Sequence, residues 1–117
     1  MARPRKAGLD YFPFDVNFFS DKKIRILKSR YGADGIELYL YLICETYKNG
    51  YYIQMDEDYI DLIHDELHMS SEKVMQVMKF LLERSLLDST LFQSDTIITS
   101  LGIQRRFQEA VKSRGSK

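Results

Sequence analysis

Cysteine and long apolar runs are both scarce in this sequence, and each scarcity excludes a class of protein. One cysteine, Cys44, among 117 residues excludes an internal disulfide framework and is typical of a chain kept in a reducing cytoplasm. No apolar run approaches the roughly 20 residues that a membrane span needs. The charged start of the chain is not followed by an apolar stretch, so it does not resemble a signal peptide. We therefore expect a cytoplasmic protein with no membrane contact.

The residues that are present describe an ordinary globular chain with an uneven distribution of charge. Hydrophobic residues make up 44% of the chain and charged residues 29%, which predicts one folded domain. The net charge is zero, yet residues 1–30 carry a net charge of +5, residues 31–98 carry −9 and residues 99–117 carry +4. Such a separation says more about binding partners than the total charge does.

Hydrophobic periodicity predicts a mainly helical chain. Ser20 is the expected N-cap of the first helix and Gly32 its C-terminal cap. Asp34 with Glu37 resembles a capping box for the second helix, and Asp56 precedes the third as an N-cap. The predicted helices span residues 21–31, 35–48, 57–67, 71–85 and 101–113; a short strand spans 51–55, and strands 86–92 and 96–100 flank a turn as a β-hairpin.

The order of these elements predicts the fold class. A tight connection at 68–70 joins the third and fourth helices as a helix-turn-helix, and a hairpin follows. This order is typical of an α+β, mainly helical winged helix, here with extra N- and C-terminal helices. We expect residues 1–8 to form a flexible basic arm, residues 9–113 the domain, and residues 114–117 a frayed end in the N-terminal part of a longer protein.

Before the first helix lies an aromatic-rich segment, residues 9–19. We expect it to be extended around Pro13, because the residue before a proline avoids helical geometry. Its rings are expected to pack on the domain as core rather than to form a base-stacking platform. The rings are those of Tyr11, Phe12, Phe14, Phe18 and Phe19.

Basic residues of the arm and the first helix are the first candidate site, because few acidic residues accompany them. Lysine and arginine side chains that neutralise phosphates supply sequence-independent affinity for nucleic acid. The alternative is a solvated face that keeps the domain soluble. The candidate phosphate contacts are Arg5, Lys6, Lys22, Lys23, Arg25, Lys28 and Arg30, joined by Arg105 and Arg106 of the last helix.

The fourth helix is the formal recognition helix of a helix-turn-helix, and its candidates for base or phosphate contact are Lys73, Gln76 and Lys79. The third helix beside it is strongly acidic, and an acidic neighbour opposes approach to a phosphate backbone. We therefore expect less from groove reading than the architecture suggests. The acidic helix could instead dock a basic patch, such as that of another copy of the chain.

Residues for catalysis are missing. His64 and His68 are spaced as in a zinc metalloprotease helix, but a catalytic zinc needs three protein ligands and no third histidine exists. Cys44 lies in an apolar helix and is expected to be a small core residue. No phosphate-cradling glycine loop, nucleophile elbow or catalytic triad can be assembled. We expect no enzyme activity, no cofactor, no metal and no small-molecule substrate.

One family resemblance rests on four stretches, Gly8–Asp15, Asp21–Ile24, Tyr31–Ile36 and Tyr39–Leu42. Together they resemble the N-terminal domain of phage and prophage replication-initiation proteins, the replisome-organiser group related to DnaD, and the resemblance extends to about Ile103. It implies a winged helix that binds origin DNA and helps to recruit a helicase loader. It also leaves open an interaction or self-assembly module, a homo-oligomer whose DNA binding lies elsewhere in the full protein.

Overall fold

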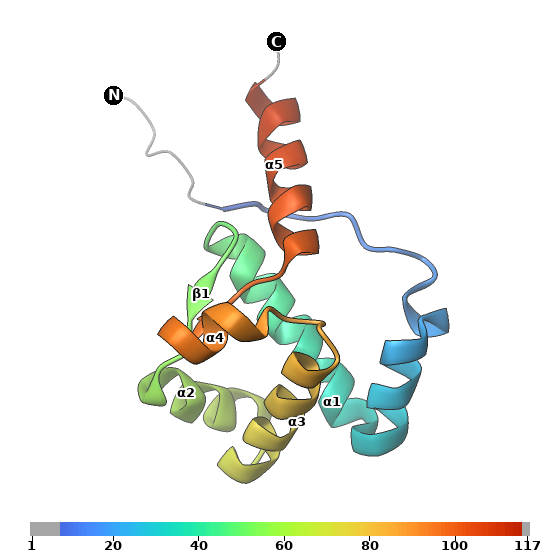
Figure 1. The fold of residues 1–117 in the computed structure, drawn as a ribbon, viewed down its shortest axis with the longest axis vertical. Helices are drawn as coiled ribbons and strands as arrows, with labels where there is room; N and C mark the ends of the chain where they lie inside the picture. Colours follow the sequence, from blue (N-terminus) through green and yellow to red (C-terminus); the bar gives the residue numbers. More distant parts are fainter. Residues whose placement is uncertain (1–7, 116–117) are drawn as a thin grey trace.

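The computed structural model describes residues 8–115, which form five α-helices, a short 3-10 helix and a two-stranded antiparallel sheet. The mainly helical α+β class predicted from the sequence is confirmed. Within the described residues, none of the helices is long and apolar enough to cross a membrane. In chain order the elements are η1 (Phe18–Ser20, a 3-10 helix), α1 (Lys22–Lys48), β1 (Ile53–Gln54), α2 (Glu57–Leu67), α3 (Ser71–Glu83), α4 (Ser89–Asp95), β2 (Ile97–Ile98) and α5 (Leu101–Gly115) (Figure 1).

Helix α1 contains both of the first two predicted helices, joined across a sharp kink at Gly32. Gly32 has φ 64° and ψ −151°, a backbone conformation that essentially only glycine adopts without strain. The prediction that Gly32 interrupts the helix is therefore confirmed. The predicted cap Ser20 is wrong, because the carboxylate of Asp21 accepts hydrogen bonds from the backbone N–H groups of Lys23 and Ile24, at 2.9 and 3.3 Å.

The helix-turn-helix forms where the sequence predicted it. Asp56 caps α2 by accepting a hydrogen bond from the N–H of Tyr59, at 2.9 Å. The chain turns at His68, whose φ of 56° is left-handed. Ser70 then caps α3, accepting from the N–H of Lys73 at 3.1 Å. Helix α3 ends at Glu83, two residues before the predicted end.

The predicted hairpin over residues 86–100 is wrong. Asp88 accepts a hydrogen bond from the N–H of Leu91 at 2.9 Å and so begins helix α4, where a strand and turn were expected. Strand β2 pairs with β1 instead, and Ile53 lies opposite Ile98. The two strands of this small sheet lie before α2 and after α4 in the sequence, so their pairing is long-range.

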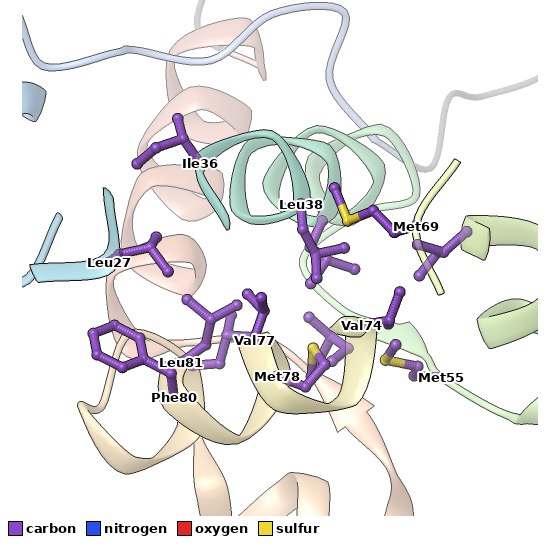
Figure 2. Close-up of a cluster of buried hydrophobic side chains, with 14 of the residues drawn as sticks. Leu27, Ile36, Leu38, Met55, Met69, Val74, Val77, Met78, Phe80 and Leu81 are labelled. Carbon is purple, nitrogen blue, oxygen red and sulfur yellow. The ribbon is translucent and has the colours of Figure 1, made fainter. Parts of the chain in front are cut away.

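The core lies between α1, α2 and α3. Figure 2 shows Leu38 of α1 above Val77 and Leu81 of α3, with the side chains of the two helices meeting between them. Leu38, Val77 and Leu81 are fully buried, as is Ile63 of α2. The other buried residues of α3 are Val74, Met78 and Phe80. The core therefore fixes α3 rigidly against α1.

The aromatic segment packs only in part. The ring of Phe12 stacks on Tyr47 with centroids 4.5 Å apart, and Phe18 stacks on Tyr39 at 6.2 Å. Tyr11 and Phe19, in contrast, are 87% and 57% exposed. A hydrogen bond of 2.8 Å from the N–H of Leu9 to the carbonyl of Tyr47 holds the start of the segment against the end of α1. The predicted arm over residues 1–8 falls outside the described residues except for Gly8.

Helix α5 follows β2 and packs on the C-terminal end of α1 through Ile103, which is buried, and Phe107. In Figure 1 it projects away from the body formed by α1, α2 and α3. It continues to Gly115, beyond the predicted end at residue 113. Cys44 corrects another expectation: it is exposed on α1 rather than part of the core.

Candidate nucleic-acid interface

The N-terminal half of α1 presents a row of cations to solvent. Ile24 and Leu27 are buried on the inner side of this half-helix, whereas the charged residues around them are exposed. Asp21, the acid next to them, is engaged as the N-cap. No ion pair joins any of these cations to an acid elsewhere in residues 8–115. The exposed cations are Lys22, Lys23, Arg25, Lys28 and Arg30.

Arg84 extends this row from the end of α3. The guanidinium groups of Arg30 and Arg84 lie 5.5 and 5.3 Å from the ring centre of Phe80. At these distances the ring attracts both cations, so one buried aromatic holds two positive charges from different helices near each other. We call Lys22, Lys23, Arg25, Lys28, Arg30 and Arg84 the basic surface.

A hollow of about 540 Å³ lies within the basic surface and is lined by Lys22, Arg25 and Arg30. It is open and contains no acidic side chain among its lining residues. Arg84 was absent from the sites predicted from the sequence. The sequence shows a positive charge at residue 84, but the approach of Arg84 to Arg30 depends on the packing of α3 against α1.

On α3 the predicted contacts are less available than those on α1. Lys73 forms an ion pair with Asp34 of α1, with 2.6 Å between Nζ and Oδ2. Asp34 was predicted as part of a capping box, and this pairing replaces that role. Gln76 and Lys79 are exposed, but so are Glu72 and Glu83 on the same helix. The outer face of α3 therefore carries little net charge.

Helix α2, the first helix of the helix-turn-helix, places negative charge beside α3. Every acidic side chain that the sequence placed on it is exposed. A phosphate backbone approaching α3 would meet this charge, whereas one approaching the basic surface would not. The acidic residues are Glu57, Asp58, Asp61, Asp65 and Glu66.

The remaining candidates do not join the basic surface. Arg106 of α5 turns toward the domain, where its Nε–H donates to the hydroxyl of Tyr47 at 2.7 Å. Gly102 leaves room for this arrangement, since a Cβ there would lie 3.1 Å from Nη2 of Arg106. Arg105 is exposed, on a helix that packs at the far end of α1. Arg5 and Lys6 lie outside the described residues.

Three half-buried tyrosines have raised pKa values. Burial raises the pKa of Tyr39 to about 12, although Arg106 lowers it in part. Burial, with Glu66 and Glu45 nearby, raises the pKa of Tyr41 to about 12. The pKa of Tyr59 is raised by burial and by Glu45, to which its hydroxyl donates a hydrogen bond of 3.4 Å. These phenols therefore keep their protons near neutral pH.

The histidine pair does not form a metal site. His64 lies on α2 and its Nδ1 hydrogen-bonds the carbonyl oxygen of Met69. His68 lies beyond the end of α2 in a left-handed conformation, so the two rings do not share a helical face. Among residues 8–115, no group of three His, Cys, Asp or Glu side chains could hold a metal ion.

Two comparisons with known proteins found sequences similar to this chain. The family described as Lin1244/Lin1753-like, N-terminal, matches residues 11–103. A protein described as "Uncharacterized phage-related protein Lin1244/Lin1753", from Listeria innocua serovar 6a, is 32% identical over 114 residues. The match covers 97% of this chain but only 37% of that relative. No solved structure matches the chain.

Proposed function

The chain belongs to the Lin1244/Lin1753-like N-terminal family, and we propose that it is a non-enzymatic DNA-binding module that contacts phosphates through its basic surface. The observation that carries the proposal is the set of six exposed or half-buried cations on α1 and α3, which no acid among the described residues neutralises. Unpaired lysine and arginine side chains gathered on one face are the electrostatic footprint of a nucleic-acid interface.

The location of the charge favours α1 over the recognition helix. Cations outnumber acids at the basic surface, whereas on the face of α3 Glu72 and Glu83 lie beside Lys79. Lys73 would have to leave Asp34 before it could contact DNA. Contacts to phosphates position a protein on DNA but do not read its sequence. We therefore propose binding with little sequence preference by the chain alone.

A cytoplasmic replication role extends the proposal. One relative is described as phage-related, and the stretches between Gly8 and Leu42 resemble the DnaD-like replisome organisers. A module that holds origin DNA while the rest of a longer protein contacts a helicase loader would fit both resemblances. This chain spans little more than a third of that relative's length, which leaves room for such contacts in the remainder.

Fluorescence anisotropy tests the DNA-binding proposal. The 117-residue chain is titrated into labelled duplex and single-stranded oligonucleotides at salt concentrations from about 50 to about 200 mM, over which a protein with six phosphate contacts loses on the order of 1,000-fold in affinity. The double variant Arg30→Glu/Arg84→Glu should weaken binding and flatten the salt dependence. Arg105→Glu reverses one charge outside the basic surface and serves as the control.

Two results would contradict the proposal. One is the absence of salt-dependent binding at the lowest salt concentration. The other is a loss with Arg105→Glu that equals the loss per charge with the double variant, because binding would then not depend on the basic surface.

A further inference from the structure

A pocket lies between the aromatic segment, α1 and α5. Its volume is about 340 Å³, and protein pockets that hold small ligands have volumes from about 300 Å³ upward. In Figure 1 the segment before η1 passes α5 and then curves round to the start of α1. The segment contributes Phe14 and Phe18 to the lining, α1 contributes Ile24 and Tyr39, and α5 contributes Arg106. The two ends of the described chain thus build the pocket together.

Aromatic rings form one wall of this pocket. The rings of Phe14 and Phe18 have centroids 4.9 Å apart and are tilted by 36° to each other. Phe18 is half-buried and stacks on Tyr39. Phe14, in contrast, is 48% exposed, so the protein covers its ring only in part. A partly exposed ring beside a pocket offers a surface on which a flat ligand can stack.

Two hydrogen-bond donors meet at the pocket. The Nε–H of Arg106 donates to Tyr47, but no ion pair engages its guanidinium within residues 8–115. The phenol of Tyr39 lies near enough to Arg106 and Asp21 for their charges to act on its pKa. Burial keeps this phenol protonated near neutral pH, and no residue between 8 and 115 forms a hydrogen bond with its hydroxyl. A ligand in the pocket therefore meets N–H and O–H donors.

The pocket also contains two carboxylates, which oppose the binding of an anion inside it. Oδ1 of Asp15 accepts a hydrogen bond from the N–H of Asn17 at 2.8 Å, and Oδ1 of Asp21 caps α1. The second oxygen of each carboxylate accepts no hydrogen bond from the described part of the chain. Two acids beside the single cation Arg106 make an anionic ligand unfavourable here. The matching ligand is a neutral planar ring whose edge carries both acceptors and donors.

The pocket borders the basic surface. Ile24 lines the pocket and also a second hollow, which Arg25 and Lys28 line. Asp21 lines the pocket and directly precedes Lys22. A ring in the pocket can therefore be joined to an anionic group that the cations outside hold. A nucleotide has this composition, because its base is an aromatic ring with donors and acceptors and its phosphate is an anion.

We propose that the pocket receives an unpaired nucleobase, which stacks on Phe14 and hydrogen-bonds with Arg106 and Tyr39 while its phosphate lies on the basic surface. The strand preference in this inference rests on the proposed DNA contact. It favours the single strand, because the bases of a duplex are paired and stacked within it and must be extruded before they can enter a pocket. A free nucleotide carries the same base chemistry, so the experiment includes both sources.

Single strands with and without bases test the inference. Fluorescence anisotropy measures the affinity of the 117-residue chain for a labelled strand of about 12 nucleotides and for an abasic strand of the same length. The abasic strand keeps the phosphates and sugars but has no base to enter the pocket. The intact strand should bind on the order of tenfold more tightly, which is the contribution expected from the stacking of one base.

Variants of the aromatic segment assign the difference to the pocket. Phe14→Ala removes the stacking ring and should abolish most of the tenfold difference, with the affinity for the abasic strand unchanged. Phe14→Trp keeps a stacking surface and should retain the difference. Tyr11→Ala changes an exposed ring of the same segment that does not line the pocket, and it is the matched control. Circular dichroism verifies the helical content of each variant.

A titration with thymidine monophosphate, followed by backbone amide NMR shifts, examines the free nucleotide. The amides of Phe14 and Phe18 report on the pocket. We expect these amides to shift at lower concentrations of the intact strand than of the mononucleotide, because the strand makes more phosphate contacts with the basic surface.

The outcomes separate this inference from the proposed function. Equal affinities for the intact and abasic strands overturn the inference, and salt-dependent binding of both strands would leave the proposed function intact. If neither strand binds, the proposed function fails and the nucleotide titration decides. Shifts at Phe14 and Phe18 would then retain the pocket as a site for a free nucleotide, whereas unchanged shifts overturn the inference as well.

Discussion

Helix α1 and the helix-turn-helix α2–α3 differ in how their charges are arranged, although both contribute to one core. The cations of α1 are exposed and unpaired, whereas α2 is acidic and α3 has its Lys73 tied to Asp34. Architecture alone would assign DNA binding to α3. The charges favour α1 instead, and under our proposal the helix-turn-helix serves as the frame that positions a different helix.

The largest effect should come from the core role of α3. Leu81 is fully buried against α1, and Leu81→Ala should lower the free energy of unfolding by about 3 kcal/mol through lost burial and a cavity. Urea unfolding followed by circular dichroism measures it. Gln76→Ala, an exposed change on the same helix, should stay within about 0.5 kcal/mol. Equal losses for the two variants would contradict a structural role for the inner face of α3.

Charge reversal compares the two regions as DNA contacts. Lys23→Glu/Arg25→Glu on α1 should weaken DNA binding on the order of 100-fold at low salt, because two phosphate contacts become repulsions. Lys79→Glu on α3 should weaken it only a few-fold, because that face already carries two glutamates. Anisotropy titrations measure both affinities. A larger loss of affinity with Lys79→Glu would indicate that α3 is the main DNA contact.

The kink that separates the two halves of α1 can be tested at Gly32. Gly32→Ala should lower the free energy of unfolding by about 2 kcal/mol, since φ 64° and ψ −151° strain any residue with a Cβ. Apart from the adjacent backbone of the same helix, no atom lies within 4 Å of such a Cβ, so the loss would reflect backbone strain rather than a clash. Ser29→Ala, an exposed change in the same helix, is the control in the same unfolding experiment. An unchanged stability in Gly32→Ala would mean that the kink can straighten.

The burial of Tyr39 on α1 predicts a smaller effect on stability, which occurs at high pH. The pKa of Tyr39 is raised from 10.0 to about 12, so the folded chain keeps a proton that the unfolded chain loses over this interval. Stability contributed by the neutral phenol is therefore complete below pH 10 and declines by at most about 2 kcal/mol as the pH rises to 12. Unfolding curves over this range should decline less steeply for Tyr39→Phe, and an unchanged decline would contradict burial as the cause.

Local signals in the sequence predicted much of the helical fold. Asp56 and Ser70 cap helices that begin where their patterns begin, and Gly32 marks the kink. The hairpin prediction was wrong for two reasons. Asp88 caps a helix, and this signal outweighs the strand propensity of the apolar residues that follow it. The strand partner of Ile98 is Ile53 rather than a neighbouring segment. Strand pairing over such a distance has no local signature.

The candidate site was only partly predictable for the same reason. Charge counting identified the cations of α1 directly. It could not show that Phe80 holds Arg84 beside Arg30, or that Arg106 turns toward Tyr47, because both depend on contacts between helices. Cys44 was expected inside because its helix is apolar on all sides. The structure places it on the exposed side of α1.

The most direct test of the central claim, that α1 rather than α3 contacts DNA, is the mapping of backbone amide NMR shifts during a titration with a short DNA duplex. The account predicts that the perturbed amides cluster between Lys22 and Arg30 and around Arg84. Perturbations concentrated between Glu72 and Lys79 of α3, with Lys22 to Arg30 unchanged, would contradict it.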